Sequence, residues 1–498
     1  MKVWTKMKRR LMCLGIILSK YPLRIVLYDV QCKKLRIKHT LEDISKYAAD
    51  GIVNFRKDDE CYFSEKDIPT ISMRALLSIA FDCSLTLEQV ETIFKRTIHM
   101  RYSSYFIEGT VDFSATLLSP LFWEKIAVMT RQCFKMIGER GLSNFLELEK
   151  ETIPILHRIF DTGYPVDVQK AVKEYRKLEK VLTETKDKLW EKYCIYPYMH
   201  SNYKGNDEIS RLTNLYEKTE KKMRQFPVEV TTSREKILYL PCEFNSIGTD
   251  SFRITTYKYN VQGFSKDLRS CFLPKFKGNV LVEYDVVSSQ IMLLGYLSGE
   301  QKLISLYQKG EDIYSCIASY ITGKSFVGTV ERNTYKHMVL QLTYGAGSRT
   351  IFKEIGSESK ISYETVLHFK NGFYNLFPAI KEYSDMVKTT DEIHLPDGRI
   401  WEMQGVIEPY KRLAYIMQYL ESLLLRKAME LIYDRTKGMK IWLYLCIHDS
   451  VWVETTHESV QTAKRIVQQS FNDALKSIFK NSQFVRLDEE AHYGKEKL

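Results

Sequence analysis

Two aspartates, Asp285 and Asp449, each lie beside a run of apolar residues. Asp285 lies in 281-LVEYDVVSSQIMLLGYLSGE-300, and Asp449 lies in 440-KIWLYLCIHDSVWVE-454, where the pattern predicts a buried hairpin with the acid at its turn. A carboxylate close to the interior is costly unless it is paired or binds a metal. Each acid alone is equally compatible with a turn aspartate that bonds nearby backbone amides. Two such acids on adjacent strands could hold two divalent cations about 4 Å apart for phosphoryl transfer.

A cationic helix is predicted between the two acids, within 331-ERNTYKHMVLQLTYGAGSRTI-351. Arg332 and Lys336 are four residues apart and therefore share a helix face. Tyr344 follows a little over two turns later, on roughly the same side. Gly345 and Gly347 are then expected to loosen or end the helix. Such a helix could offer cations to a triphosphate and a ring to a base or sugar. The simpler alternative is an amphipathic helix whose charged residues are solvated.

The elements that must position these residues alternate between strand-rich and helical stretches. Residues 1–140 mix strand-like runs such as 24-RIVLYDV-30 with helical ones, and residues 141–225 are helical and charged. We expect one long helix over 167–193 with Asp167 as its N-cap, and the Lys-rich segment 217–226 at the tip of this helical arm. Strand signals begin at 236 and return at 440 after a helical stretch. A sheet interrupted by a helical insertion is therefore predicted.

Composition sets broad limits on the class of protein. The 498 residues, of which 44% are apolar, suffice for two or three domains. No run of eighteen apolar residues occurs, so we expect no membrane span. The segment 7–18 has the basic-then-apolar order of a signal peptide but no small-residue cleavage site, and we interpret it as a first strand or helix. Ten cysteines without a Cys-x-x-Cys pair predict a reduced intracellular compartment and no zinc site. The net charge of +11 is compatible with a polyanionic partner.

From about residue 140 to 498 the chain resembles the family A, or DNA polymerase I-like, DNA polymerases. Several motifs of that family occur in its order, and chance does not readily produce such a series. They are 151-ETIPILHRIFDTGYPVD-167, 248-GTDSFRITTYKYNVQGFSKDLRSCFLP-274, Asp285 with 297-LSG-299 downstream, 310-GEDIY-314, Arg332 with Lys336, Tyr344 and Gly345, 373-FYNLFPAIKEY-383, Met417-Gln418, and His448-Asp449.

The resemblance implies an α+β right-hand polymerase fold, in which an antiparallel palm sheet carries helical fingers and a helical thumb. The implied regions are an N-terminal α/β region that is a shortened, inactive exonuclease-like remnant or an unrelated module (1–140), a thumb (141–235), a first part of the palm (236–300), fingers (301–395) and a second part of the palm (396–498).

The resemblance also implies roles for individual residues. Asp285 and Asp449 would bind two Mg²⁺ ions, with Mn²⁺ as an alternative, and Lys336 would assist catalysis at the leaving group. The incoming nucleotide would contact Arg332, Lys336, Tyr344, Gln290 and Arg269. The primer and template would contact Arg253, Gln418, His448, Asn260 and Gln262.

Three departures from the family pattern leave the choice of sugar open. Gln290 stands where the family has Glu, Ser450 where it has Glu, and Leu340 where it has an aromatic residue. These residues resemble single-subunit, phage-type RNA polymerases. DNA synthesis is favoured by the 248–274 stretch and by the short span between Tyr344 and His448. A non-catalytic nucleic-acid-binding relic is a further alternative, but such a protein would have no need of both acids and both cations.

The first 140 residues were compared with a proofreading exonuclease, and the sequence as a whole also suggests a cellular location. A proofreading exonuclease would need Asp-x-Glu on its first strand, and the nearest candidate, Asp29-Val30-Gln31, lacks the second acid. We therefore expect a DNA polymerase without proofreading, acting in DNA replication or repair on a primer–template with dNTPs. We expect a soluble, intracellular monomer of the cytoplasm or nucleoid of a host, or of an organelle, and a processivity factor is left open.

Overall fold

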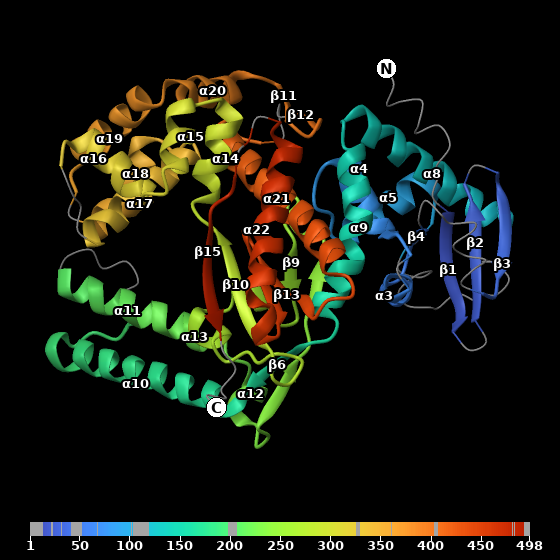
Figure 1. Cartoon of the computed structure of the whole chain (residues 1–498), viewed down its shortest axis with the longest axis horizontal. Helices are drawn as coiled ribbons and strands as arrows, with labels where there is room; N and C mark the ends of the chain where they lie inside the picture. Colours follow the sequence, from blue (N-terminus) through green and yellow to red (C-terminus); the bar gives the residue numbers. More distant parts are fainter. Residues whose placement is uncertain are drawn as a thin grey trace.

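The computed structural model describes residues 13–20, 23–30, 32–40, 52–66, 68–100, 102, 119–197, 207–324, 329–359, 361–402, 407–480, 482 and 484–492. At its centre lies a four-stranded antiparallel sheet in the order β13-β14-β10-β15 (Figure 1). Its strands are β10 (Val280–Val286), β13 (Ile441–Ile447), β14 (Ser450–Thr455) and β15 (Leu487–His492). The buried hairpin predicted at 440–454 is therefore confirmed as β13 and β14.

Two long helices pack together against this sheet, α21 (Arg412–Thr436) and α22 (Val460–Ile478). Helix α22 has the apolar periodicity of a half-buried helix, whereas α21 is buried along most of its length. Helix α9 (Ser143–Phe160) packs on α21, and their buried side chains join those of the sheet in one core. A short 3₁₀ turn, η3 (His457–Ser459), leads from β14 into α22.

A helical lobe is inserted between β10 and β13, as predicted. It continues directly from β10 and lies beyond one end of the central sheet (Figure 1). Its elements are α14 (Ser289–Ser298), α15 (Gln301–Gln308), α16 (Ile313–Thr322), α17 (Thr329–Thr343), α18 (Ser348–Ser359), α19 (Tyr363–Leu376), α20 (Pro378–Thr389), β11 (Glu392–His394) and β12 (Ile400–Glu402). Gly345 has φ 76° two residues after Thr343, the last residue of α17, so the predicted helix end at this glycine is confirmed.

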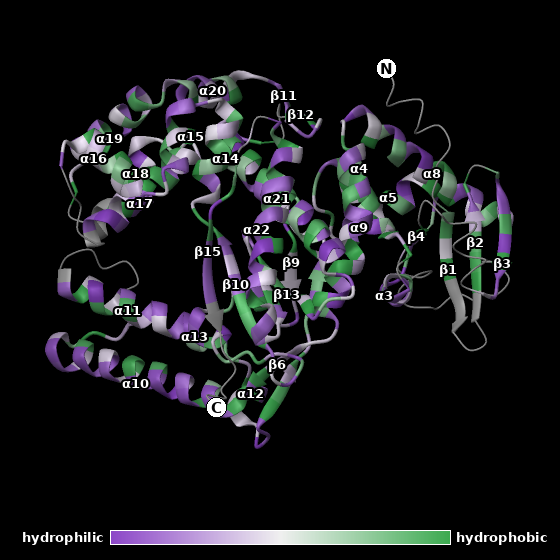
Figure 2. Ribbon diagram, in the orientation of Figure 1, coloured by the Kyte–Doolittle hydropathy of each residue, from purple (hydrophilic) through white to green (hydrophobic). Residues whose placement is uncertain are grey.

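Two paired helices, α10 (Val168–Tyr193) and α11 (Asp207–Met223), project from the sheet as an arm (Figure 1). Asp167 caps α10 by accepting a hydrogen bond from the Lys170 amide at 2.9 Å, as predicted. Both helices are largely hydrophilic along their length (Figure 2). The expected position of 217–226 at the tip is wrong. These residues form the end of α11 that returns to the sheet, where Lys222 pairs with Asp267 at 2.7 Å.

Short elements connect the arm to the central sheet. They are β6 (Tyr164–Asp167), α12 (Val228–Thr232), β7 (Ile237–Leu240), β8 (Glu243–Asn245), β9 (Thr255–Tyr257), η2 (Val261–Gly263) and α13 (Lys266–Arg269). Strand β6 pairs with β7, and β8 pairs with β9, each antiparallel.

The N-terminal region contains a second, mixed sheet in the order β3-β2-β1-β4-β5. Strands β1, β2 and β3 are antiparallel, whereas β4 and β5 run parallel to β1. Its elements are β1 (Cys13–Lys20), β2 (Leu23–Asp29), β3 (Lys34–Lys38), β4 (Ile52–Asn54), α3 (Lys57–Glu65), β5 (Thr70–Ser72), α4 (Met73–Phe81), α5 (Leu87–Ile98) and α8 (Pro120–Glu139).

Strands β1 and β2 contain described residues of the two N-terminal segments that the sequence singled out, 7–18 and the stretch ending at Asp29. The described part of 7–18 lies in strand β1, one of the two predicted alternatives, and residues 7–12 lie outside the described ones. Asp29 ends the second strand, whereas β1 contains no acidic residue. Within the described residues, no helix is long and apolar enough to cross a membrane.

Candidate active site

The two predicted acids lie at the same end of neighbouring strands of the central sheet, Asp285 in β10 and Asp449 in the turn before β14. Asp285, near the end of β10, is paired in register with Ser450 on β14, and Asp449 directly precedes Ser450. The backbone amide of Val286 donates to the carbonyl of Asp449 at 3.3 Å. The prediction that these acids share one end of the sheet is therefore confirmed. The structure adds a third acid, Asp488 on β15, in register with Asp285 on its other side.

Left-handed backbone conformations shape the chain beside both acids. Ser288, which precedes helix α14, has φ 50°, and His448 in the hairpin turn has φ 49°. Such values are uncommon for residues other than glycine and are stabilised here by the surrounding structure. Both turns change the chain direction within a few residues of a carboxylate.

Three acidic side chains and one basic side chain contribute to the electrostatic environment of Asp285. The pKa of the Asp285 carboxyl is raised from 3.8 to about 7, first by burial and then by the nearby charges of Asp449, Glu283 and Asp488. Lys266 opposes this shift only weakly, as the last contribution. A divalent cation would relieve this repulsion, so the donor set fits a hard, oxygen-bound metal.

A buried carboxylate from helix α21, Glu421, is hydrogen-bonded into the same site. Glu421 is 3% exposed and forms an ion pair with Arg253. The hydroxyl of Ser289 lies 2.8 Å from Glu421 Oε1 and 2.7 Å from Asp449 Oδ2. Burial raises the pKa of Glu421, while Arg253 lowers it. Ser289 thus links a buried ion pair to one of the two predicted metal ligands.

Tyr344 and Gln290 lie together beside Arg253. The pKa of the Tyr344 hydroxyl is raised to about 12 by burial and by the charge of Glu421, which outweigh the opposing contacts with Arg253 and Gln290. Gln290 Oε1 is buried without a hydrogen-bond partner. Gln290 and Tyr344, which were both expected to contact the incoming nucleotide, therefore lie close together. The carboxylate that Gln290 lacks is present nearby on another element, as Glu421.

The two cations of helix α17 meet an aromatic ring of α16. The guanidinium carbon of Arg332 lies 5.7 Å from the ring centroid of Tyr314, and Lys336 Nζ lies 5.4 Å from it. They share one helix face, as predicted. Arg332 also forms a bidentate ion pair with Asp312, at 2.7 and 2.6 Å. Any anion that binds Arg332 must compete with Asp312 or join it.

The residues expected to contact a primer–template lie around the hairpin turn. The side chain of Gln262 donates to the carbonyl of Cys446 in β13 at 2.9 Å, and Asn260 caps η2. Gln418 accepts from Ser251 at 3.1 Å. Desolvation by the surrounding protein, followed by the positive charge of Arg253, lowers the pKa of His448. Asn260 and Gln262 thus support the protein structure itself, whatever else they bind.

Arg269 lies at the end of α13, where its guanidinium carbon is 5.9 Å from the ring centroid of Trp452. The positive charge of Arg269 also contributes to the lowered pKa of His448. Arg253 and Arg269 therefore both lower the pKa of His448, in the hairpin turn that also carries Asp449.

Several residues of this site were missed in the sequence. They are Glu421, Ser289, Tyr314, Asp312, Glu283 and Asp488. Glu421 had a usable signal, because it lies three residues after Gln418 in an otherwise apolar stretch and so shares its helix face. Asp488 had no such signal in the sequence, because 487-LDEEAH-492 lacks the apolar alternation of a strand.

Comparison with known proteins agrees with this geometry. The model of DNA polymerase family A matches residues 143–395, about half of the chain. DNA polymerase I of Aquifex aeolicus is 26% identical over 251 residues, which cover 48% of this chain and 43% of that protein. The thermostable DNA polymerase I of Thermus aquaticus is 24% identical over 46% of this chain and 30% of its own length.

A longer match is with DNA polymerase I of Caldicellulosiruptor bescii, at 20% identity over 80% of this chain and 52% of that protein. This chain thus spans about half or less of the length of these curated relatives. Among solved structures, the POL domain of Pol1 from M. smegmatis, in complex with DNA primer-template and dNTP, shares the fold with a TM-score of 0.74 and 13% identity. The alignment covers 98% of this chain and 97% of that one.

The family model begins at the first residue of α9 and ends just after β11, so it includes strand β10 with Asp285 and the α17 cations. The solved fold extends the likeness over the hairpin with Asp449. The chain belongs to DNA polymerase family A.

Proposed function

We propose that this protein is a template-directed DNA polymerase, which adds dNTPs to the 3′ end of a primer. The observation that carries the proposal is the placement of Asp285 and Asp449 at one end of adjacent antiparallel strands, inside a family A fold. The relatives named DNA polymerase I and the solved polymerase–DNA–dNTP complex support the same substrates.

Family A polymerases generally use divalent metals, and we propose two Mg²⁺ ions here. Asp285 and Asp449 would hold them, with Asp488 and Glu283 adding to the negative potential. Bound there, the ions would lower the pKa of the primer hydroxyl and stabilise charge on the reacting phosphate. The excess of carboxylates around Asp285 is the feature of this chain that favours such ions.

The cations of α17 are proposed to bind and orient the triphosphate. Arg332 would exchange part of its ion pair with Asp312 for phosphate oxygens, and Lys336 would neutralise or protonate the pyrophosphate leaving group. Tyr344 would stack near the new base pair, beside Gln290. Arg253, Gln418, His448 and the Asn260–Gln262 turn remain the proposed contacts of the primer terminus.

Replacing Asp449 by Asn tests the proposal, because the amide keeps the size of the side chain but removes its charge. We expect Asp449→Asn to reduce primer extension by at least about a thousandfold while leaving the Kd for primer–template nearly unchanged. Asp434→Asn, at an exposed aspartate paired with Lys437, is the matched control. Extension by Asp449→Asn at the rate of that control would refute the proposal.

RNA synthesis is a second candidate, and Gln290 is the observation that favours it. The family's glutamate is absent, and Gln290 is neutral with a buried, unpartnered oxygen. Gln is nearly as large as Glu, so we propose that it still excludes a ribose 2′-hydroxyl. Gln290→Ala should then increase the use of rNTPs relative to dNTPs about tenfold or more in competition assays. Unchanged selectivity would remove this role from Gln290.

We also propose that the N-terminal region does not proofread. The only candidate acid noted in the sequence, Asp29, ends strand β2 and accepts a hydrogen bond from the Cys32 amide at 2.8 Å. Strand β1 has no acid with which to hold a metal. A primer with a 3′ mismatch should therefore remain uncleaved under conditions that support extension.

A further inference from the structure

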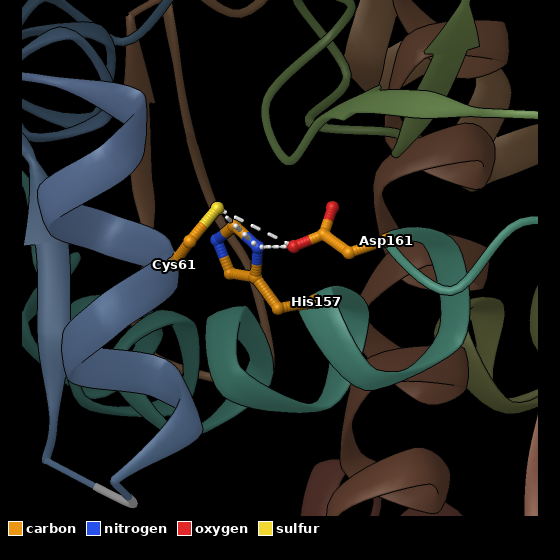
Figure 3. Close-up of side chains that lie close together, drawn as sticks. All are labelled: Cys61, His157 and Asp161. Atoms are coloured by element: carbon orange, nitrogen blue, oxygen red, sulfur yellow. Dashed lines mark hydrogen bonds and ion pairs between the residues drawn. The ribbon is translucent and has the colours of Figure 1, made fainter.

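A cluster of three metal-ligating side chains lies outside the active site, between the N-terminal region and helix α9. Cys61 comes from α3, whereas His157 and Asp161 come from the last turn and C-cap of α9 (Figure 3). One potential ligand atom from each residue lies within 4.8 Å of the others. His157 and Asp161 are four residues apart, so they share a helix face, and Cys61 faces them from the neighbouring helix.

The distances within this cluster match the edges of a tetrahedral zinc site. Cys61 Sγ lies 3.5 Å from His157 Nδ1 and 3.4 Å from Asp161 Oδ2. With a Zn–S bond of about 2.3 Å and Zn–N or Zn–O bonds of about 2.0–2.1 Å, tetrahedral ligands are about 3.5 Å apart. His157 Nδ1 and Asp161 Oδ2 are directly hydrogen-bonded to each other, so the Asp161 carboxylate must withdraw slightly to admit an ion. Because Asp161 is on the exposed side, this movement displaces no core residue.

The other nitrogen of His157 has the partner that metal-binding histidines usually have. Nε2 lies 3.1 Å from Oε1 of Glu60, the residue next to Cys61. A carboxylate that accepts the second ring N–H fixes the tautomer in which Nδ1 is free to bind a metal. The ring is 5% exposed and packs edge-to-face on Phe244, with 4.8 Å between centroids. Glu60 and Phe244 therefore hold the His157 ring in the orientation that metal binding requires.

We propose that Cys61, His157 and Asp161 bind one Zn²⁺ ion, with water at the fourth position. Thiolate, imidazole and carboxylate together select a borderline-soft ion such as zinc over Mg²⁺. The ion would join α3 to α9 and so fasten the N-terminal region to the helix that supports the central sheet. Cysteine spacing predicted no zinc site because this one takes a single cysteine, and its partners lie about a hundred residues away in the sequence.

The competing interpretation is an ion-pair network without metal. Burial alone would lower the pKa of His157, but its hydrogen bonds with Asp161, Cys61 and Glu60 raise it to about 11. An imidazolium between two carboxylates is stable by itself, with the thiol as a bystander. The two interpretations differ in whether Cys61 is required for metal uptake.

Metal binding by the full-length protein distinguishes them. The chain is stripped with a chelator, dialysed against zinc chloride and then against metal-free buffer, and its zinc is quantified by mass spectrometry. We expect about one zinc per chain in the wild type and less than about 0.2 in Cys61→Ser and in Asp161→Asn. Cobalt chloride should give a thiolate-to-cobalt charge-transfer band in the wild type that Cys61→Ser lacks.

Cys316→Ser is the matched control, since Cys316 is also partly exposed and lies 3.2 Å from a carboxylate oxygen of Glu311 but has no histidine in this pair. It should retain both the zinc and the cobalt band. Far-ultraviolet circular dichroism verifies that each variant is folded. Zinc content that is unaffected by Cys61→Ser and Asp161→Asn, or no retained zinc in the wild type, would overturn the proposal in favour of the ion-pair network.

Discussion

Asp285 illustrates the conflict between stability and function at the scale of a single residue. Its native pKa of about 7 lies above the ordinary value of 3.8, so folding becomes less favourable as pH rises from about 4 to 7, and the cost persists above 7. Asp285→Asn removes the charge and its repulsion by Asp449, Glu283 and Asp488. We expect it to abolish extension and, without divalent ions at pH 8, to raise the free energy of unfolding by on the order of 1 kcal/mol.

Urea denaturation at two pH values measures this effect. The gain should be largest at pH 8 and much smaller at pH 4, where Asp285 is protonated in the native state and about half protonated in the unfolded state. Asp391→Asn, at an exposed position, should show no such pH-dependent gain. A destabilised Asp285→Asn at pH 8 would contradict the electrostatic account of this acid.

Glu421 acts through other residues and is expected to position them. Its ion pair with Arg253 and its hydrogen bond with Ser289 connect Arg253, a proposed primer contact, to Asp449. Glu421→Gln would leave Arg253 without its counter-charge, and a hydrogen bond to a charged group contributes about 1.5–3 kcal/mol. We expect kcat/KM for extension to fall roughly tenfold to a hundredfold, mainly through kcat, with the Kd for DNA little changed.

Steady-state and single-turnover extension measure this loss. Glu430→Gln, on the same helix but beside Lys427, is the control and should behave like the wild type. A pH–rate profile adds a readout that a packing defect alone would not move, because His448 and Asp285 both titrate beside this network. Equal kinetics for the two variants would remove Glu421 from the site.

At the residue scale, the sequence predicted the acids better than their surroundings. Asp285 and Asp449 could be found because each interrupts a local apolar pattern, which is visible without the fold. The partners of Glu421 and Asp488 come from remote segments, and their proximity depends on strand register and helix rotation. No local pattern contains that information.

At the scale of elements, local signals succeeded where a side chain acts on its own backbone. The Asp167 cap and the helix end at Gly345 depend on neighbouring residues only, and both were predicted. The position of 217–226 was wrong because charge alone does not tell which end of a helix returns to the sheet. Strand β15 was not predicted because its sequence, LDEEAH, has the acidic composition that is typical of a loop.

One buried ion pair connects two elements that support the site. Arg426 of α21 and Glu149 of α9 are both fully buried and paired, and Arg426 also donates to the carbonyl of Phe252 at 3.2 Å. Removing one partner leaves an uncompensated buried charge, which typically costs about 3–5 kcal/mol. We expect Arg426→Met to lose that much in urea denaturation, and Arg426→Met combined with Glu149→Leu to lose clearly less.

An exposed ion pair at the end of the same helix provides the control. Lys437→Met, which removes the partner of Asp434, should change stability by less than about 0.5 kcal/mol. If Arg426→Met were as mild as this control, the pair would not be what holds α21 to α9.

At the scale of the whole molecule, the fold brings together what the sequence separates. The helical insertion between β10 and β13 leaves the central sheet intact, so Asp285 and Asp449 become neighbours across it. The same core continues into the N-terminal region. The packing of the N-terminal region on this core was not predictable, because the first 140 residues carry no motif that indicates which surface they contact.

Arg399 makes one of the contacts that hold the N-terminal region in place. It is fully buried, pairs with Asp82 at 2.6 Å, and stacks on the ring of Trp401 with 3.6 Å to the centroid. Arg399→Met would leave the largely buried carboxylate of Asp82 without its ion-pair partner, and the N-terminal region should open more often. We expect limited proteolysis to cleave residues 68–100 at least about tenfold faster than in the wild type.

The matched control for this experiment is Arg435→Met, which removes a half-exposed ion pair with Asp473 far from that contact. Its proteolysis should follow the wild type. An Arg399→Met protein as resistant as the control would show that the N-terminal region is held by its apolar contacts alone.

Primer extension by the full-length wild-type protein tests the central claim most directly. A labelled primer is annealed to a DNA or an RNA template and offered dNTPs or rNTPs separately with Mg²⁺, at matched concentrations. The account predicts Mg²⁺-dependent extension with dNTPs on DNA, at least about a hundredfold faster than with rNTPs. Preferential extension with rNTPs, or no template-directed extension with either nucleotide, would contradict it.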